Sequence, residues 1–382
     1  MEPFDVIVVG AGIQGCSTAY QLAIRGQRTL LLEQFDALHT RGSSHGASRI
    51  TRMAYDRHHY AEMMKEAFPM WDEIEKEYGQ QIFVRTGFLF VDVPGGDGQT
   101  TVERVLKRVN IPMETLDDEE FRRRYPMLRY SKSVKGTLER FGGILLADKA
   151  RQCLQELFLK HGGTVKTNER VLHVQPGAII TVHTSKATYK ARSVVLTVGA
   201  WASELVKSLG IELPLQLKRI SVCYWRVDRP EDWDADHFPA YVDFSGKHHM
   251  YGVPVYEYPG LYKLCWHHGP TLTSPNERDQ VDDSAAVHTV SQYIREHMAG
   301  MSDTPSIIEP CIYTCTPDND FILDKHPNHS NIVIGAGFSG HGFKLAPVVG
   351  RILAALAIGE DTQYDMKPFK ITRFGKTVTS SL

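Results

Sequence analysis

At both ends of the chain a short apolar run, a glycine-rich turn and a helix-like stretch follow one another directly. Near the N-terminus, "DVIVV" (5–9) leads into Gly10, Gly12 and Gly15, which have G-x-G-x-x-G spacing. A helical stretch and a second apolar run follow. That run ends at Glu33, close to the ~20 positions after the motif at which a ribose-binding acid is expected. This order predicts a strand–turn–helix–strand unit at the start of the chain.

Such a unit has the chemistry of a dinucleotide site. Gly10 permits a tight turn, Gly12 lets a pyrophosphate approach the backbone, and Gly15 allows the helix to pack closely on the strand. The helix N-terminus favours the anion, and Glu33 would bind the adenosine ribose. A plain βαβ turn without a ligand is the alternative, and the motif does not distinguish NAD from FAD.

The C-terminal unit, "NIVIGAGFSGHGFKLAPVVGRILAALA" (331–357), repeats the same arrangement, and Lys344 opens its helix. Its turn contains Gly335, Gly337, Gly340 and Gly342, which are four glycines within eight residues. A structural βα turn needs fewer, so this density indicates a backbone pressed against a flat ligand.

A third apolar run begins at residue 191 and leads into Gly199 and Trp201. Two glycine units at opposite ends of one chain imply that the termini meet around one cofactor, as in an FAD domain into which another domain is inserted. We therefore expect an α/β protein with a Rossmann-like FAD-binding domain and an inserted, mainly β substrate domain. The predicted segments are 1–80, 141–214 and 301–382 for the first, and 81–140 and 215–300 for the second.

Composition narrows the function classes. With 382 residues the chain is long enough for two domains, and its net charge of −2 offers no pull toward nucleic acid or anionic lipid. We find no signal peptide and no membrane span, and expect a soluble intracellular protein whose six cysteines are free thiols. A methionine–aromatic stripe over 60–77 is typical of a core helix.

A metal site is not expected, although the chain has 17 histidines. The adjacent pairs 58–59, 248–249 and 267–268 point their side chains to different sides in either a strand or a helix. No HExxH or CxxC motif is present.

Five stretches together resemble the monomeric sarcosine oxidase family, most closely its animal peroxisomal members. They are "HTRGSSHGASRITRMAY" (39–55), "MYGVP" (250–254), "YKLCWHH" (262–268), "CIYTCTPDNDFILDKHP" (311–327) and "GAGFSGHGFK" (335–344). The resemblance implies a flavoenzyme that oxidises secondary amino acids, such as sarcosine or L-pipecolate, with molecular oxygen and releases hydrogen peroxide. It also implies one FAD per chain, attached through a cysteine thioether to the 8α-methyl group.

Strand periodicity cannot choose between Cys311 and Cys315, because both would lie on one face together with Tyr313. The resemblance favours Cys311, because the linked cysteine of the family precedes an x-Tyr-Thr tripeptide, as Cys311 does here. A buried thiol without chemistry is the alternative.

The resemblance also implies roles for residues on the four other motifs. Arg49 would lie over the flavin on the loop "SHGASRITR", with His45 beside it. Arg52 on the same loop and Lys344 would bind the substrate carboxylate, and the helix N-terminus would help. Lys263 would lie near flavin N5. Because it is a cation in an otherwise apolar and aromatic stretch, we also expect it to act in oxygen activation, the alternative being a packed stem whose head reaches water. Tyr251 and His267 would shape the pocket beside the amine, although His268 could face inward instead. The expected cofactor-binding residues are Gly10, Gly12, Gly15, Glu33, Gln34, Ser43, Gly199, Trp201, Cys311, Gly337, Gly340, Gly342 and Lys344.

Two other functions stay open from the residues alone. One is an FAD-dependent dehydrogenase of the same fold that passes electrons to another acceptor, and the other is a dinucleotide-binding module without turnover. We expect a monomer. The ending "SSL" is a degenerate form of the peroxisomal S-K-L signal, so we expect a peroxisomal location with the cytoplasm as the alternative.

Overall fold

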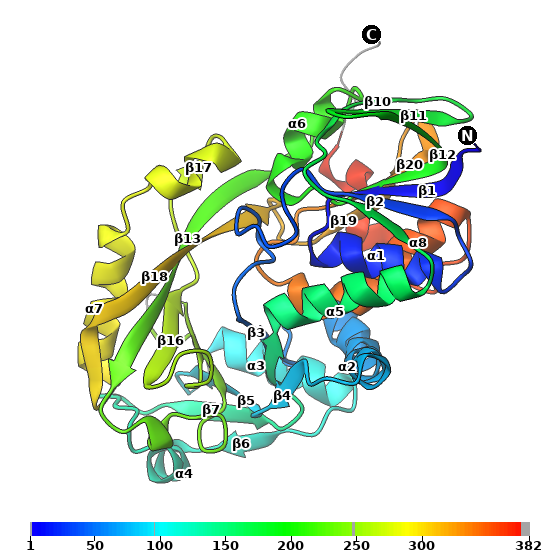
Figure 1. Ribbon diagram of the computed structural model, residues 1–382. Coiled ribbons are helices and arrows are strands. Elements are labelled where there is room, and N and C mark those ends of the chain that lie inside the picture. The colour runs from blue at the N-terminus through cyan, green and yellow to red at the C-terminus, as the bar shows by residue number, and fades with distance from the viewer. Residues whose placement is uncertain (1, 95, 247–248, 376–382) are drawn as a thin grey trace.

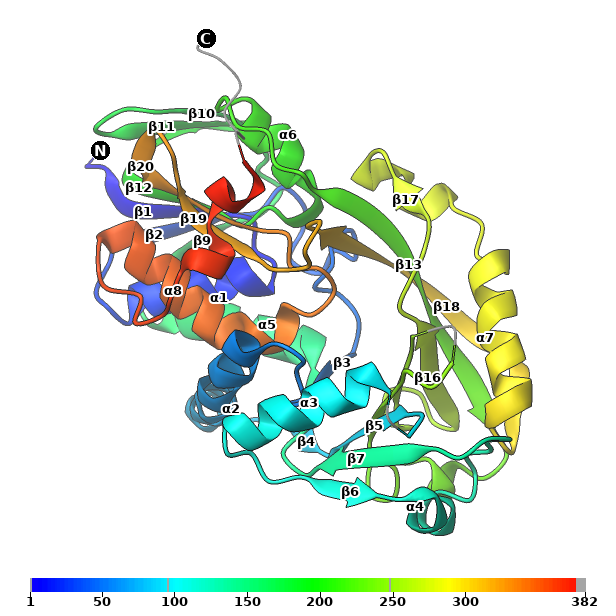
Figure 2. The same ribbon diagram turned by 180° about the vertical axis from the view of Figure 1, so that it is seen from behind.

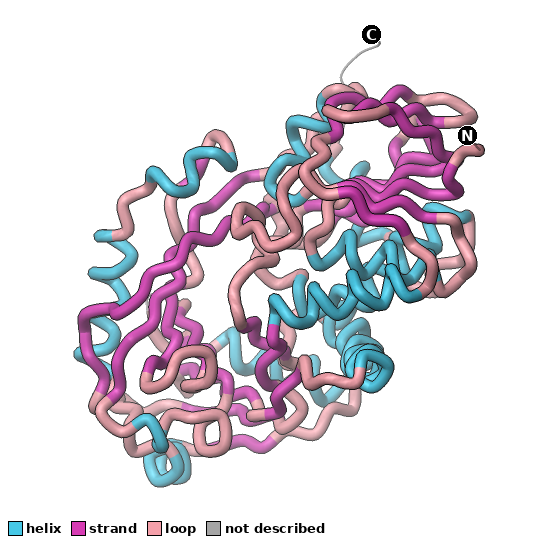
Figure 3. Tube along the Cα trace, viewed as in Figure 1, coloured by secondary structure: helices cyan, strands magenta, loops and turns pink. Residues whose placement is uncertain are grey.

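The computed structural model describes residues 2–94, 96–246 and 249–375, and within them the chain forms three sheets. An eight-stranded sheet and a nine-stranded sheet lie at opposite sides of the molecule, and a three-stranded sheet lies between them (Figure 1). Figure 3 shows how the helices gather beside the eight-stranded sheet. The C-terminal "SSL" lies outside the described residues.

The eight-stranded sheet has a parallel centre in the order β9-β2-β1-β12-β20. These strands are the short apolar runs of the sequence, and parallel strands of this kind are buried on both faces. Helices α1, α5 and α8 cover one face (Figures 1 and 2). The bounds are β1 (Phe4–Val9), β2 (Thr29–Leu32), β9 (Thr164–Lys166), β10 (Val171–Gln175), β11 (Ile180–Thr184), β12 (Thr188–Leu196), β19 (Ile322–His326), β20 (His329–Ala336), α1 (Ile13–Ala23), α5 (Ala147–Lys160) and α8 (Ala346–Ile358).

The nine-stranded sheet has the order β17-β13-β16-β15-β14-β5-β7-β6, and β18 pairs with β13. Helix α7 packs against β18 on the outside of this sheet. The bounds are β5 (Phe88–Asp92), β6 (Glu114–Leu116), β7 (Lys135–Glu139), β13 (Gln216–Val227), β14 (Ala240–Asp243), β15 (Met250–Val253), β16 (Leu261–Trp266), β17 (Thr271–Leu272), β18 (Met301–Cys315), α3 (Asp97–Arg108), α4 (Asp118–Arg124) and α7 (Ser284–His297).

The remaining elements connect the two large sheets. The small sheet has the order β3-β8-β4, and α2 packs against α8 and α5. The bounds are β3 (Ser48–Thr51), β4 (Phe83–Arg85), β8 (Gly143–Leu146), α2 (His58–Tyr78), α6 (Ala202–Lys207), and the 3-10 turns η1 (Gly199–Trp201), η2 (Pro230–Asp232), η3 (Pro275–Gln280), η4 (Phe343–Leu345), η5 (Lys367–Phe369) and η6 (Ile371–Phe374).

The two longest strands form an antiparallel ribbon that runs along the nine-stranded sheet toward the eight-stranded one (Figure 1). Gln216 of β13 lies opposite Cys315 of β18, and Ile220 lies opposite Cys311. The cysteine-bearing end of β18 lies close to the edge at which β1 and β12 end.

Most of the predicted elements are confirmed. Both strand–glycine–helix units form as expected, and the 60–77 stripe lies within α2, where it belongs to the core. Two details differ. The stretch "SHGASRITR" is not all loop, because Ser48–Thr51 pair with β8 as strand β3. Lys344 lies in the 3-10 turn η4 that precedes α8 rather than in the α-helix itself.

The predicted α/β architecture is therefore confirmed, whereas the division into residue segments remains a prediction. One strand bears on it: β18 begins at residue 301 and pairs within the nine-stranded sheet. Among the described residues no helix combines the length and apolarity that a membrane crossing requires.

Candidate active site

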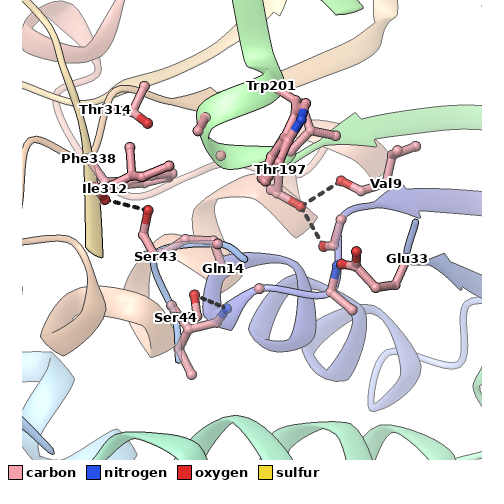
Figure 4. A pocket seen from close by; sticks show the side chains of 18 of the residues that line it. Val9, Gln14, Glu33, Ser43, Ser44, Thr197, Trp201, Ile312, Thr314 and Phe338 are labelled. Atoms are coloured by element: carbon pink, nitrogen blue, oxygen red, sulfur yellow. Dashed lines mark hydrogen bonds between the residues drawn. The ribbon is translucent and has the colours of Figure 1, made fainter. Parts of the chain in front are cut away.

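A cavity of about 440 Å³ opens where strands β1, β2 and β12 end, and the cysteine-bearing part of β18 closes its far side (Figure 4). Val9 and Leu32 mark the ends of β1 and β2, and Ile312 and Thr314 line the cavity from β18. Ligands of open α/β sheets bind at the carboxyl ends of strands, so this is the expected edge.

The turn after β1 has a shape that only glycine permits. Gly10 has a φ of 96°, and a Cβ on it would lie 2.6 Å from the carbonyl oxygen of Thr197. Thr197 fixes the turn, because its hydroxyl donates to the carbonyls of Val9 and Gly10 at 3.0 and 3.1 Å (Figure 4). A Cβ on Gly15 would lie 1.8 Å from the Gly10 carbonyl, so the start of α1 packs directly beneath the turn.

Glu33 is buried at the end of β2 and is tied to the same turn. Its Oε2 accepts a hydrogen bond from the Ala11 amide at 2.8 Å, and its Oε1 accepts one from the Phe35 amide at 3.1 Å. An ionised carboxylate has about four lone-pair positions, so each oxygen can still accept a ligand hydroxyl.

The C-terminal glycine turn lies against β18. Gly340 has a φ of 79°, and a Cβ there would lie 2.6 Å from Cε2 of Tyr313. The Ser339 amide donates to the Thr314 carbonyl at 2.9 Å. From the other side, the Ser43 hydroxyl donates to the Ile312 carbonyl at 2.6 Å (Figure 4).

Three buried polar atoms in the cavity lining have no hydrogen-bond partner in the described chain. They are Oε1 of Gln14, Nε2 of His45 and Oγ1 of Thr314. Buried polar atoms are nearly always satisfied, so these three indicate a polar ligand. Together with two glycine turns and a helix N-terminus, they fit a long dinucleotide such as FAD.

Cys311 lines this cavity, whereas Cys315 is not among the described residues that line it. Cys315 lies at the end of β18, opposite Gln216, and burial raises the pKa of its thiol while Lys218 lowers it. All six cysteines are free thiols, and no group of described residues could hold a metal ion.

Two predicted cations lie together beside Ser48 at the start of β3. Arg49 lines the cavity and donates to the Ser48 carbonyl at 2.7 Å, and the Lys263 ammonium reaches the same carbonyl at 3.3 Å. Arg49 also donates to the carbonyl of His45. Burial, with Arg49 nearby, lowers the pKa of His45 to about 3, so this imidazole is neutral at physiological pH.

The other two predicted cations face a common ring. The Arg52 guanidinium lies 4.5 Å from the ring centroid of Tyr55, and the Lys344 ammonium lies 5.7 Å from it. Lys344 donates to the His341 carbonyl rather than to a carboxylate. Burial lowers the Lys344 pKa well below its usual value, and the positive charges of Arg52 and Arg49 lower it further. A carboxylate ligand beside this ring would pair with Arg52 and would favour the charged form of Lys344.

His267 and Tyr251 reach the cavity through Tyr313. The His267 ring lies 5.2 Å from that of Tyr313, which lines the cavity, and 6.1 Å from that of Tyr251. His267 is the inner member of its pair, because its ring faces Tyr313 and Tyr251 whereas His268 is exposed. Burial, with His268 and Arg52 nearby, lowers the pKa of His267 to about 3.

The structure thus brings most of the predicted residues to the cavity. Those that line it are Gly10, Gly12, Glu33, Gln34, Ser43, His45, Arg49, Gly199, Trp201, Cys311, Gly337, Gly340 and Gly342. The other predicted residues are not among those that line it: Gly15, Arg52, Tyr251, Lys263, His267 and Lys344.

Sequence reasoning missed several residues at this site. Tyr55 and His341 are in the quoted motifs, and the Tyr55 hydroxyl lies 3.2 Å from Nδ1 of His341. Their positions in the motifs could have identified them. Glu139 and Glu257, the buried carboxyl groups near Arg52 and Lys263, carry no local signal, because only the tertiary structure brings them there.

Comparisons with known proteins agree with this geometry. The family model described as FAD dependent oxidoreductase matches residues 5–356. The peroxisomal sarcosine oxidase of Mus musculus is 46% identical, over 97% of this chain and 96% of the mouse protein. The monomeric sarcosine oxidase of Bacillus sp. (strain NS-129) is 34% identical, over 97% of both chains.

A solved structure shares the fold at lower identity. The L-proline dehydrogenase from P. horikoshii superposes with a TM-score of 0.85 at 21% identity, covering 98% of both chains. The predicted fold class, family and oxidoreductase activity are confirmed. The chain belongs to the family of FAD-dependent oxidoreductases and, within it, to the sarcosine oxidases.

Proposed function

We propose that the chain is an FAD-dependent amine oxidase that converts secondary amino acids of the sarcosine and L-pipecolate type to imines and passes the electrons to oxygen. The observation that carries this proposal is the pair of cations, Arg52 and Lys344, over the Tyr55 ring next to the cofactor cavity. A substrate carboxylate bound there would supply a negative charge between the two side chains. The planar guanidinium of Arg52 suits a bidentate contact with it.

The same pair would orient the substrate. Binding the carboxylate holds the neighbouring amine and its carbon near Tyr251 and His267, which pack behind Tyr313. With its pKa of about 3, His267 is neutral and can accept a hydrogen bond from the amine. When bound, FAD accepts a hydride from the carbon next to the amine.

We assign the covalent attachment to Cys311. Cys311 lines the cavity beside Ile312, whose carbonyl accepts a hydrogen bond from the Ser43 hydroxyl. This bond fixes the backbone next to the thiol to another part of the cavity lining. Attachment would join Sγ to the 8α carbon of the flavin, with loss of the thiol proton and one methyl proton. The two electrons released would reduce the flavin, and oxygen would reoxidise it.

The alternative is a dehydrogenase of the same fold, such as the L-proline dehydrogenase, which would pass the electrons to another acceptor. The proposal differs from this alternative in having oxygen as the acceptor. Lys263 supports an oxidase, because it presents a buried ammonium beside Arg49. A fixed positive charge stabilises negative charge that develops when oxygen is reduced.

The decisive test is the electron balance under air. Purified protein supplied with sarcosine, L-pipecolate or L-proline should release one hydrogen peroxide for each amine oxidised. A dye that accepts electrons, with no peroxide formed, would identify a dehydrogenase instead. No consumption of any of these amines would leave only a binding module.

A monomeric state and a peroxisomal location complete the proposal. They are supported by the named relatives, one called monomeric and one called peroxisomal. Sedimentation equilibrium checks the first, and imaging the tagged chain with and without its last three residues checks the second.

A further inference from the structure

Two positive side chains share one backbone carbonyl behind the cofactor cavity. Arg49 and Lys263 both donate to the Ser48 carbonyl, and Lys263 also donates to the Ser48 hydroxyl at 3.0 Å. Lys263 is 5% exposed. Like charges at such short range in a buried site repel, so a nearby negative charge is required to hold them.

Glu257 supplies that charge. Its Oε1 lies 3.3 Å from the Lys263 ammonium, and its side chain is only 4% exposed. Glu257 lies between strands β15 and β16, outside the motifs that identify the cofactor and substrate sites.

A tyrosine fixes the orientation of this carboxylate. The Tyr224 hydroxyl donates to Oε2 of Glu257 at 2.6 Å and lies 3.2 Å from Oε2 of Glu309. Burial and the charge of Glu257 raise the Tyr224 pKa far above its usual value, so Tyr224 remains a donor. Both oxygens of Glu257 are thereby held, one by Lys263 and one by Tyr224.

We propose that Glu257 is a positioning residue that fixes the Lys263 ammonium at Ser48 and sets the net positive charge beside the flavin. Reduction adds negative charge to a bound flavin, so nearby positive charge favours the reduced form and nearby negative charge opposes it. Glu257 offsets one of the two cations. This inference rests on the proposed function only in requiring that FAD occupies the cavity.

The test is the reduction potential of the bound flavin, measured by anaerobic dye titration of the holoenzyme. Glu257→Gln keeps the size of the side chain and removes its charge. We expect the ratio of reduced to oxidised flavin at a fixed potential to rise at least tenfold, which is about 30 mV for a two-electron couple. Tyr224→Phe keeps the Glu257 charge and should change the ratio less than threefold.

A double variant shows whether the Glu257 charge itself acts on the flavin potential when Lys263 is absent. Lys263→Met alone should lower the ratio, and Lys263→Met combined with Glu257→Gln should return it to within about threefold of wild type. The double variant removes both members of the Glu257–Lys263 ion pair, so neither is left as an uncompensated charge. It therefore also serves if Glu257→Gln alone does not retain flavin. In that case the ratio of reduced to oxidised flavin in the double variant must be at least tenfold higher than in Lys263→Met.

Two results would overturn the inference. One is a flavin reduction potential in Glu257→Gln that equals that of wild type. The other is a reduction potential in the double variant that is no higher than that in Lys263→Met. Neither measurement uses an amine or oxygen. Shifted potentials in a protein that no secondary amine reduces would therefore support the inference and contradict the proposed function.

Discussion

At the scale of single residues, the two thiols of β18 have different expected roles: one binds the cofactor and the other only packs. Cys311 lines the cavity, and Cys315 occupies the end of the strand. We expect acid-precipitated Cys311→Ala protein to be colourless, because its flavin is not covalently held. Wild type and the matched control Cys315→Ala should both give yellow pellets. A yellow Cys311→Ala pellet beside a colourless Cys315→Ala pellet would reverse the assignment.

The carboxylate site is also tested by single residues. Arg52→Gln or Lys344→Gln removes one charge-assisted contact, which is worth about 1.5–3 kcal/mol of binding. Acetate, a simple carboxylate inhibitor, should therefore bind at least about tenfold more weakly to either variant. The control Lys65→Gln removes an exposed charge on α2 and should not change acetate binding. Unchanged inhibition of both active-site variants would place the carboxylate elsewhere.

Glu139 gives a pH-dependent prediction. This carboxyl group is fully buried, and burial raises its pKa from 4.5 to about 8, although the Met53 amide and Arg52 act in the opposite direction. The folded chain keeps the proton that the unfolded chain releases above pH 4.5, so this group lowers the free energy of unfolding as pH rises from about 5 to 8.

Glu139→Gln resembles the protonated form and keeps an acceptor for the Met53 amide. The difference in unfolding free energy between Glu139→Gln and wild type should increase in favour of the variant as pH rises, by up to about 3 kcal/mol at pH 7. Denaturant unfolding at several pH values measures the difference, with exposed Glu119→Gln as the control. A difference that does not depend on pH would mean that Glu139 does not titrate in this window.

At the scale of elements, the C-terminal glycine turn offers a matched pair of substitutions. Gly340 and Gly162 have φ values of 79° and 85°, but a Cβ would meet Tyr313 at 2.6 Å only at Gly340. Gly162→Ala should cost about 1 kcal/mol of unfolding free energy from backbone strain alone. Gly340→Ala should cost roughly 1–3 kcal/mol more and lower the flavin content, because Tyr313 must move. Equal costs would contradict the close packing of this turn on β18.

The elements differ in how well the sequence predicts them. The units at 5–33 and 331–357 were predictable, because apolar runs and glycine spacing reflect local backbone needs. Strand β3 was not, because "SRIT" is polar and becomes a strand only by pairing with β8. The 15-residue length of β18 was also missed, since its first ten residues gain their order from the register with β13.

At the scale of the whole molecule, the site depends on segments that are far apart in the chain. Arg52 follows β3, Lys263 lies on β16, Cys311 on β18 and Lys344 before α8, and only the packed sheets bring them together. The family motifs identified these residues from the sequence. Glu257 could not be identified in that way, because its role arises from a contact with Lys263 that the fold creates.

The most direct test of the whole account is anaerobic mixing of the purified yellow protein with single amino acids. We predict that sarcosine and L-pipecolate bleach the flavin, and that Arg52→Gln requires at least about tenfold more substrate for the same rate. Glycine, a primary amine with the same carboxylate, should bleach it far more slowly. If the flavin stays oxidised with every secondary amino acid, the cation pair is not a substrate site and the account is wrong.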